Sequence, residues 1–458
     1  MVTAGGTNPI ETFGPIAPEK GLPLHSCGVF GGDYVSKLFH LLIVPSLFCV
    51  FALGQAHEKV LYSFGNGASD GSAPNGGLVF DSAGNIYGTT RLGGKSGCSA
   101  QCGTVFELSP SSKGGWTETV LYTFCSQTNC TDGGNPTGGL AADGDGNLYG
   151  TAVAGGIYGG ICHGGGCGTV FELSPPSSQG GSWSYTVLWS FGSVANDGGG
   201  PLGGLTWDTL GNLYGTTGSG GADSGLGTVF ELALQPSGFW DETILYTFCP
   251  GQVEPCVDGF QPEAGVSFGP SGDIYGTTSF GGVKSGASTW GVLFELLPSG
   301  DGSWTESTLY RFQPSGGGHP MSGVNFDRKG NAYLTTNNGA ANSPGLCGSV
   351  FGFAPNGQHR SYQFTDSGIG CNPSAGLFVD PNGSKLYGTT SDGGSNGGGV
   401  VYEISGTEGT AIYNFCSETS CADGMTPSGT LTAHGSTLYS TTVNGGKFGQ
   451  GVVFALAP

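Results

Sequence analysis

The chain has 458 residues, of which 13 are Lys or Arg and 33 are Asp or Glu, so its formal net charge is −20. Only 10% of the residues are charged, against about 25% in an average globular chain. The 93 glycines follow no collagen-like triplet period, so they indicate turns and not a fibre. Because nucleic-acid binding needs clustered Lys and Arg, this composition excludes nucleic acid as an expected partner.

Residues 1–56 do not share the pattern of the rest of the chain. Lys37 and other polar residues precede an apolar run at 41–53, and small residues follow it. This order is typical of a cleaved secretory signal peptide, so we expect a secreted or cell-surface protein. A membrane anchor is the alternative, but the run contains Pro45 and is shorter than the ~20 residues of a span. We therefore expect no membrane span in the mature chain, and a true start of translation near Val35.

One pattern recurs seven times between residues 59 and 458, and its clearest copy spans 138–191. Each copy holds four segments rich in Val, Ile, Leu, Tyr, Phe and Thr, separated by Gly, Asn, Asp, Ser and Pro, which is typical of short β-strands. In the first full copy these segments are 77–81, 85–90, 103–108 and 117–124. Seven units of four antiparallel strands, with no helical period, predict an all-β fold, a seven-bladed β-propeller.

Aromatic residues recur in register and set the count of seven. The second segment carries Tyr87, Tyr149, Tyr214, Tyr275, Tyr333, Tyr387 and Tyr439. The third carries Phe106, Phe171, Phe230, Phe294, Phe351, Tyr402 and Phe454. Since both faces of a blade are covered by its neighbours, we predict that these rings form the core between blades. Copies five and six depart most from the pattern; Leu334 and Gly352 stand where other copies have Gly and Glu.

The two ends of the repeated region complement each other. The first repeated segment has the pattern of a fourth strand, and the last copy stops after its third strand, 451–456. We predict that the segment beginning at Val60 and ending at Phe64 completes the last blade, which removes an exposed sheet edge. Residues 57–458 are thus expected to form one propeller domain.

Two of the 14 cysteines lie in the leader, and the other twelve form pairs. The pairs are Cys98/Cys102, Cys125/Cys130, Cys162/Cys167, Cys249/Cys256, Cys347/Cys371 and Cys416/Cys421. An even number of cysteines in an exported chain predicts disulfides. Zinc is the alternative, but most pairs have no neighbouring His.

Loops between second and third strands, and between blades, open at one end of the ring. We call this end the loop-rich face, because it holds every cysteine pair and every long Gly-rich loop, and we call the other end the plain face. Binding residues concentrate on loops held by a rigid scaffold, so the loop-rich face is the candidate binding surface.

An Asp-Gly-x-x-Pro motif recurs in the inter-blade loops and supplies the candidate binding residues Asp70, Asp132, Asp197, Asp258 and Asp423. One interpretation is an Asx-turn before a rigid Pro. The other is a ring of calcium ligands, which is disfavoured because carboxylates spread around a ring would not converge on one ion. We therefore expect no cofactor, with calcium as the alternative. His163 and His319 complete the candidate set. We interpret both as solvated loop residues in preference to ligands.

Other repeated residues are interpreted as architecture. The series Trp116, Trp183, Trp240 and Trp304 precedes the fourth strand on the plain face, where turn packing is favoured over a sugar-stacking platform. The third strand carries Glu107, Glu172, Glu231, Glu295 and Glu403, which indicates a shared hydrogen bond and not a paired acid and base. No motif of catalytic residues is present.

The segments NLYGTT, GTVFEL and TVLYTF, joined by Gly-rich loops, resemble the GloVer (Gloeo-Verruco) tandem-repeat, choice-of-anchor proteins over residues 59–458. The resemblance implies an exported bacterial protein and no particular activity. The chain departs from the family pattern at Pro458, which no sorting tail follows. Gly pairs after the second strand are similar to kelch blades, and the D-x-x-G-N hairpin is similar to NHL-type repeats.

The sequence favours a binding or interaction module whose loop-rich face holds an extracellular glycan or protein. A propeller enzyme of the lactonase or lyase type is the first alternative. It rests on fold analogy and would need His, Asp or Glu converging at the pore. A purely structural extracellular protein is the second.

Overall fold

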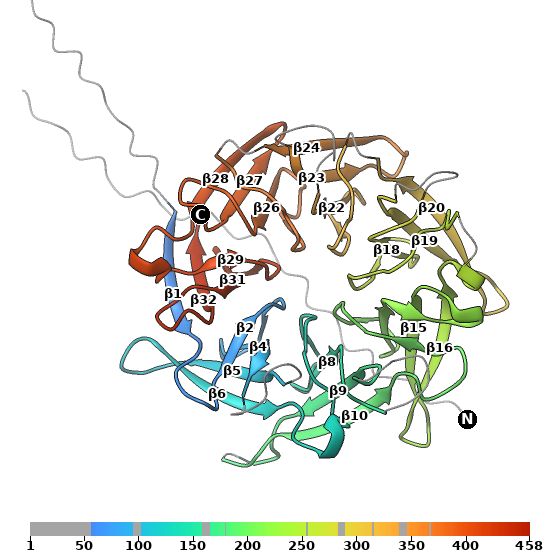
Figure 1. The fold of residues 1–458 in the computed structure, drawn as a ribbon, viewed down its shortest axis with the longest axis horizontal. Coiled ribbons are helices and arrows are strands. Elements are labelled where there is room, and N and C mark those ends of the chain that lie inside the picture. Colours follow the sequence, from blue (N-terminus) through green and yellow to red (C-terminus); the bar gives the residue numbers. More distant parts are fainter. Residues whose placement is uncertain are drawn as a thin grey trace, which may run out of the picture. The chain divides into compact units, whose positions relative to one another are not determined.

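The described residues form a ring of antiparallel β-sheets, the blades, which follow one another around an axis (Figure 1). The computed structural model describes residues 56–94, 102–157, 165–178, 180–252, 255–282, 289–313, 316–338, 346–365 and 368–458. These residues belong to the unit Leu53–Pro458. The signal peptide predicted within residues 1–56 falls almost wholly outside them and remains a prediction.

Blades are numbered 1 to 7 in chain order, and each begins with its innermost strand. Blade 1 consists of β2 (Gly71–Pro74), β3 (Val79–Phe80), β4 (Ile86–Gly93), β5 (Thr104–Pro110) and β6 (Trp116–Thr123). Blade 2 consists of β7 (Ala141–Ala142), β8 (Leu148–Ala152), β9 (Thr169–Ser174) and β10 (Ser184–Ser190). Blade 3 consists of β12 (Thr206–Trp207), β13 (Leu213–Thr217), β15 (Thr228–Leu234) and β16 (Trp240–Thr247), with the pair β11 (Gly198–Gly199) and β14 (Ser219–Gly220) beside it. Blade 4 consists of β17 (Ser267–Phe268), β18 (Ile274–Thr278), β19 (Val292–Pro298) and β20 (Trp304–Arg311).

The remaining blades follow the same order. Blade 5 consists of β21 (Asn325–Phe326), β22 (Ala332–Thr336), β23 (Leu346–Phe353) and β24 (His359–Thr365). Blade 6 consists of β25 (Phe378–Val379), β26 (Lys385–Thr390), β27 (Val400–Ser405) and β28 (Glu408–Asn414). Blade 7 consists of β29 (Met425–Pro427), β30 (Thr432–His434), β31 (Thr437–Asn444), β32 (Val452–Ala457) and β1 (His57–Ser63). Among the described residues, four single-turn 3₁₀ helices lie in loops: η1 (Thr128–Cys130), η2 (Ala222–Ser224), η3 (Pro250–Gln252) and η4 (Thr419–Cys421). The predicted seven-bladed, four-stranded propeller is confirmed.

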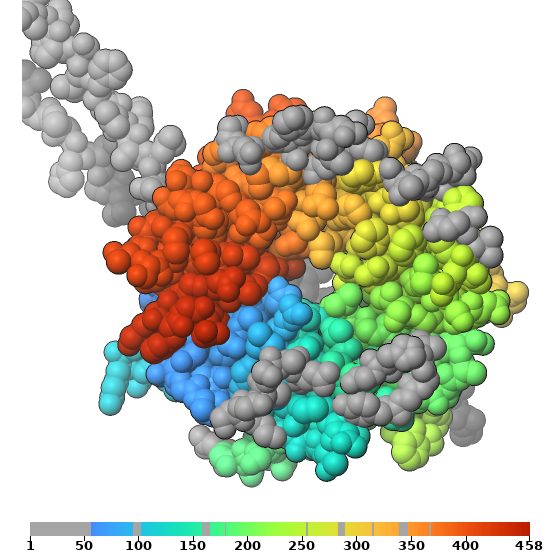
Figure 2. Space-filling view, in the orientation of Figure 1, coloured from blue at the N-terminus to red at the C-terminus, as the bar shows by residue number. Residues whose placement is uncertain are grey.

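The ring is closed by the first strand of the chain. β1 pairs antiparallel with β32, from His57 opposite Ala457 to Ser63 opposite Val452. Phe64 extends the join, because its N–H donates to the carbonyl of Gly451 over 3.0 Å. Figure 1 shows the blue β1 beside the red β32, and in Figure 2 blade 7 lies directly against blade 1. The predicted closing segment is therefore confirmed, with the strand beginning slightly earlier.

One aromatic pair joins each blade to the next. The Phe at or directly after the end of the fourth strand of one blade meets the third-strand ring of the following blade edge-on or tilted. The seven pairs are Phe64–Phe106, Phe124–Phe171, Phe191–Phe230, Phe248–Phe294, Phe312–Phe351, Phe364–Tyr402 and Phe415–Phe454. Their ring centroids lie between 4.9 and 5.1 Å apart. Aromatic pairs in this geometry add about 0.5–1.5 kcal/mol beyond the area that they bury. The core between blades thus lies where the repeated rings predicted it.

Candidate functional site

The inner ends of all seven blades meet around the axis at the residues that follow the repeated Pro. These are Asn75, Thr137, Leu202, Glu263, Met321, Ser374 and Ser428, and together with Arg91 they line a cavity of about 410 Å³. We call these eight residues the axial mouth. It lies at the loop-rich face, because the seven residues after the repeated Pro belong to the segments that connect one blade to the next.

Glycines behind the axial mouth let the blades approach closely. A Cβ on Gly138 would lie 2.7 Å from the carbonyl oxygen of Gly203, and one on Gly203 would lie 2.1 Å from the nitrogen of Gly265. No other residue fits at such distances. The inner wall is therefore backbone, and the variable residue after each Pro supplies the side chains.

The axial mouth carries few charges. Its charged members are Arg91 and Glu263. The Nε2 of Gln261 donates to Glu263 Oε1 over 3.2 Å, and burial raises the pKa of Glu263. The amide of Asn337 donates to the sulfur of Met321 over 3.2 Å. The site thus offers one carboxyl and one guanidinium among hydroxyls, amides and apolar groups.

A group of aromatic side chains lies next to the axial mouth between blades 4 and 5. Phe260 and Phe280 stack at 5.5 Å, and His319 lies 4.8 Å from Phe280 and 5.2 Å from Trp290. We call these four residues the aromatic group. Burial lowers the pKa of His319. His319 was expected to be a solvated loop residue, and the structure instead places it half-buried against these rings. His163 lies outside the described residues.

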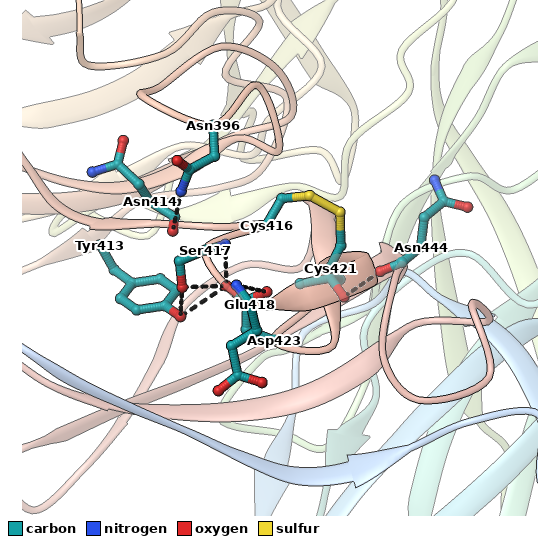
Figure 3. The surroundings of a disulfide bond; sticks show 10 residues. Asn396, Tyr413, Asn414, Cys416, Ser417, Glu418, Cys421, Asp423 and Asn444 are labelled. Atoms are coloured by element: carbon teal, nitrogen blue, oxygen red, sulfur yellow. Dashed lines mark hydrogen bonds between the residues drawn. A yellow bond between two sulfur atoms is a disulfide. The ribbon is translucent and has the colours of Figure 1, made fainter.

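The five repeated aspartates each hold their own loop. Asp132 Oδ2 accepts hydrogen bonds from the Tyr122 hydroxyl at 2.7 Å and the Ser126 N–H at 2.8 Å. Asp423 makes the same contacts with Tyr413 and the Ser417 N–H, both at 2.9 Å (Figure 3).

The other three aspartates sit in equivalent places at other blade junctions. Asp70 accepts from Tyr62, Gly65 and Asn66. Asp258 accepts from Tyr246 and Cys249, and Asp197 accepts from Ser193. The carboxylates therefore lie at five separate junctions. Across the described ranges, no three His, Cys, Asp or Glu side chains gather in a way that could hold a metal ion.

Replacing Asp132 with Asn should destabilise the protein, because the buried amide offers an NH₂ group where the loop presents N–H and O–H donors. We expect a loss of about 1–3 kcal/mol in the free energy of unfolding, measured by urea denaturation. Asp145→Asn is the control, because Asp145 is exposed in the nearby hairpin turn. Equal stability of the two variants would contradict the structural role of Asp132.

Disulfides close several of the same loops. The bonds Cys125–Cys130, Cys249–Cys256, Cys347–Cys371 and Cys416–Cys421 form as predicted. Cys102 and Cys167 are also disulfide-bonded, and their expected partners Cys98 and Cys162 lie outside the described residues. In Figure 3, Cys416–Cys421 encloses the loop whose N–H groups point at Asp423.

Two other repeated series have packing roles. Trp183 lies 5.9 Å from Tyr87 and Trp240 lies 6.4 Å from Tyr149, so each indole covers the Tyr of the preceding blade. The third-strand glutamates accept hydrogen bonds from these tyrosines in blades 2, 3 and 4, as with Tyr214 and Glu231 at 2.9 Å.

Sequence comparison now places the chain among known proteins. The profile of the Gloeobacter/Verrucomicrobia repeat matches residues 49–285 and 261–458. The chain belongs to this repeat family. No curated protein matches it.

Several solved structures resemble this Gloeobacter/Verrucomicrobia repeat protein. One is PorZ, a bacterial surface component of the type-IX secretion system of Porphyromonas gingivalis, at 15% identity and a TM-score of 0.46, covering 83% of this chain and 46% of PorZ. Another is the polysaccharide lyase Uly1, at 11% identity and a TM-score of 0.45, covering 90% of this chain and 94% of the lyase. A luciferin-regenerating enzyme matches at 11% identity and a TM-score of 0.38, covering 88% and 95% of the two chains.

Of the axial mouth and the aromatic group, only His319 was among the candidate residues predicted from the sequence. The sequence does hold a signal for the axial mouth. The Pro is the same in all seven copies, but the residue that follows it varies among them. The aromatic group has no such signal, since its members come from separate loops and recur in no other copy.

Proposed function

We infer that this protein is an exported binding module whose axial mouth and aromatic group hold a glycan. The observation that supports this most is the variation at the axial mouth. Seven equivalent backbone positions on one rigid ring carry Asn, Thr, Leu, Glu, Met and Ser. Side chains that vary on an unvarying scaffold are typical of recognition surfaces.

The chemistry of the surface favours a sugar. Amides, hydroxyls and one carboxyl can pair with sugar hydroxyls, and the half-buried rings of Phe260, Phe280 and Trp290 offer apolar faces for sugar C–H groups. A protein ligand is the competing partner. Export is supported by the disulfides, which persist in oxidising compartments. Within the described part of the chain, no helix is long and apolar enough to cross a bilayer.

A glycan array probed with the purified, disulfide-bonded protein tests this function. We expect binding to one class of neutral or weakly charged glycan. Phe280→Ala should weaken it up to about tenfold through the loss of ring contact, and Glu263→Gln should weaken it through the loss of the carboxyl. Lys113→Gln, an exposed change in a plain-face turn, should leave binding unchanged.

Folded protein that binds no glycan on the array would contradict the proposal and favour a protein partner. Glycan binding that survives both Phe280→Ala and Glu263→Gln would move the site away from the axial mouth. Turnover of a bound ligand would favour the lactonase or lyase alternative.

A further inference from the structure

The hairpin between the third and fourth strands is shorter in blade 5 than in blades 1 to 4. In blade 1 the two strands stay paired as far as Pro110 opposite Trp116, and in blade 4 as far as Pro298 opposite Trp304. In blade 5 the pairing ends at Phe353 opposite His359. The blade 5 hairpin therefore ends before the Trp position, and Tyr275 of blade 4 has no indole over it.

The shortened hairpin also changes the local charge. Leu108 stands opposite Glu118 in blade 1, and Leu296 opposite Glu306 in blade 4. At the same place in blade 5, Phe353 stands opposite His359. A basic side chain has thus replaced an acidic one.

The neighbouring pair changes in the same direction. Glu107 stands opposite Thr119 in blade 1, whereas Gly352 stands opposite Arg360 in blade 5. This pair loses a carboxylate and gains a guanidinium. In a chain of net charge −20, two adjacent pairs have therefore both shifted toward positive charge.

Two cavities flank this hairpin on the plain face, and we call them together the hairpin trough. One, of about 650 Å³, is lined by Asn331, Gln358 and Arg360 and contains no acidic residue. The other, of about 680 Å³, is lined by Tyr275, Tyr310 and Lys329 and also by the acidic residues Asp273 and Glu295. Both are walled by Phe353 and His359. These volumes are within the range of about 300–1,000 Å³ of small-molecule sites.

The shared wall presents aromatic surface next to cations. Phe353 and His359 lie 5.2 and 4.8 Å from Tyr310, and 5.7 Å from each other. Arg360, His359 and Lys329 are exposed, and within the ranges that the structure describes none of them makes an ion pair. Phe353, His359 and the Arg360 guanidinium thus line one cavity away from the loop-rich face, where Arg360 is also in hydrogen-bonding contact with Tyr333.

We propose that the hairpin trough binds a carboxylate carried on a ring with an apolar face, with Arg360 holding the carboxylate and with Phe353 and His359, which line the same cavity, facing the ring. A guanidinium pairs with a carboxylate through two parallel hydrogen bonds, and with Gly352 in place of Glu no carboxylate stands opposite Arg360 to compete for it. The amides of Asn331 and Gln358 can pair with ring substituents.

Two kinds of molecule have this chemistry, hexuronic acids and aryl carboxylic acids. Calorimetric titration of the disulfide-bonded protein with glucuronate and with indole-3-acetate separates them, and glucose and indole serve as neutral partners of each. We expect at least one acid to bind with a dissociation constant of ~1 mM or tighter, and its neutral partner to bind at least about tenfold more weakly.

Variants locate the site. Arg360→Gln should weaken binding of the acid by about tenfold or more, and Gly352→Glu should abolish it by restoring the carboxylate found in other blades. Lys113→Gln removes a cation from the same face of blade 1, where the Trp is present, and should change nothing. Thermal unfolding reports whether each variant is folded.

Binding of glucuronate alone assigns a sugar acid, and binding of indole-3-acetate alone assigns an aryl acid. The proposal is overturned if neither acid binds, if an acid and its neutral partner bind equally, or if folded Arg360→Gln binds as the wild type does. The result is independent of the glycan array, because Phe280→Ala and Glu263→Gln change the opposite face.

Discussion

Raising the pH toward about 9 should progressively destabilise the propeller, because half-buried glutamates at its blade junctions keep their protons up to about pH 7, 8 and 9 while the unfolded chain has already lost them. Glu118, Glu58 and Glu242 occupy the same register position in blades 1, 7 and 3, opposite a buried Leu. Burial is the main cause that raises their pKa values, to about 7, 8 and 9 respectively. Burial also raises the pKa of Glu306, in blade 4.

The second carboxyl of each junction is the repeated aspartate. Asp70 raises the pKa of Glu118, Asp423 raises that of Glu58, and Asp197, in hydrogen-bonding contact with Glu242, raises that of Glu242. A neutral glutamic acid can donate to the aspartate, whereas two carboxylates would repel each other.

The sequence of each blade follows this pairing. In blades 5 and 6, Gly316 and Ile369 stand in place of the Asp, and His359 and Gly409 in place of the Glu. In blade 2 the Asp remains, but Tyr185 replaces the Glu and donates to the backbone carbonyl of Asp132. Every blade that has the Glu also has the Asp, which supports a direct interaction between the two carboxyl groups.

The direction of the pH effect follows from the raised pKa values. A group whose pKa is higher in the folded than in the unfolded chain stabilises the fold fully below its unfolded value, near 4.5, and loses that contribution as pH rises through the folded value. The free energy of unfolding, measured with urea at several pH values between about 5 and 10, should fall from the low end of this range, less steeply after each glutamate ionises near 7 and 8, and should level off above about 9.

Glu242→Gln should reduce this fall near its upper end, since the amide cannot ionise. Glu408→Gln, an exposed substitution in the blade 6 hairpin, should keep the wild-type profile. Stability that does not change with pH, or an unchanged slope in Glu242→Gln, would show that these glutamates are already ionised in the folded protein.

Phe64→Ala should cost about 3–5 kcal/mol of unfolding free energy, the usual loss for a fully buried Phe. Phe64 is 0% exposed, and its ring lies 5.0 Å from Phe106 of blade 1 and 5.1 Å from Tyr62 of the closing strand. The substitution therefore opens a cavity at the contact between blade 7, in which β1 pairs with β32, and blade 1. Urea denaturation measures the loss.

A second readout separates an opened ring from a merely weakened core. If β1 leaves β32, an unpaired strand edge is exposed and the protein should begin to associate, which sedimentation at increasing concentration would detect. His57→Ala, at the exposed start of β1, should change neither quantity. A stability loss in Phe64→Ala no larger than in His57→Ala would contradict the role of this joint.

The architecture was predictable because every level of the repeat agrees. Strand composition, hairpin signals and the aromatic register all repeat seven times, so an error in one copy is corrected by the others. The closing strand was predictable from the same register. The first repeated segment has the pattern of a fourth strand, and the last copy has no fourth strand, so the first segment completes the last blade.

The binding surfaces were less accessible to sequence analysis. The axial mouth joins one residue from each of seven copies, and no single copy shows that they meet. The hairpin trough forms because the hairpin between the third and fourth strands of blade 5 is shorter than in blades 1 to 4 and has no Trp. Blade 5 also lacks the bulge that the other blades have opposite the third-strand aromatic residue, so the match between His359 and Glu118 appears only in the pairing of the strands.

The pairing of β1 with β32 also has a consequence for how the chain reaches its final form. Six joints of the ring connect neighbours in sequence, but the seventh cannot form until the last strand has been synthesised. Until then β1 has no strand to pair with. Bringing β1 and β32 together closes a loop of nearly the whole chain, which costs more conformational entropy than forming any local contact. Glu58 and Lys59 place charges on this waiting strand, which hinder premature association with another chain. β1 removes the last open edge of the finished ring, and in the nascent chain the same strand is an unpaired edge at which another chain could associate.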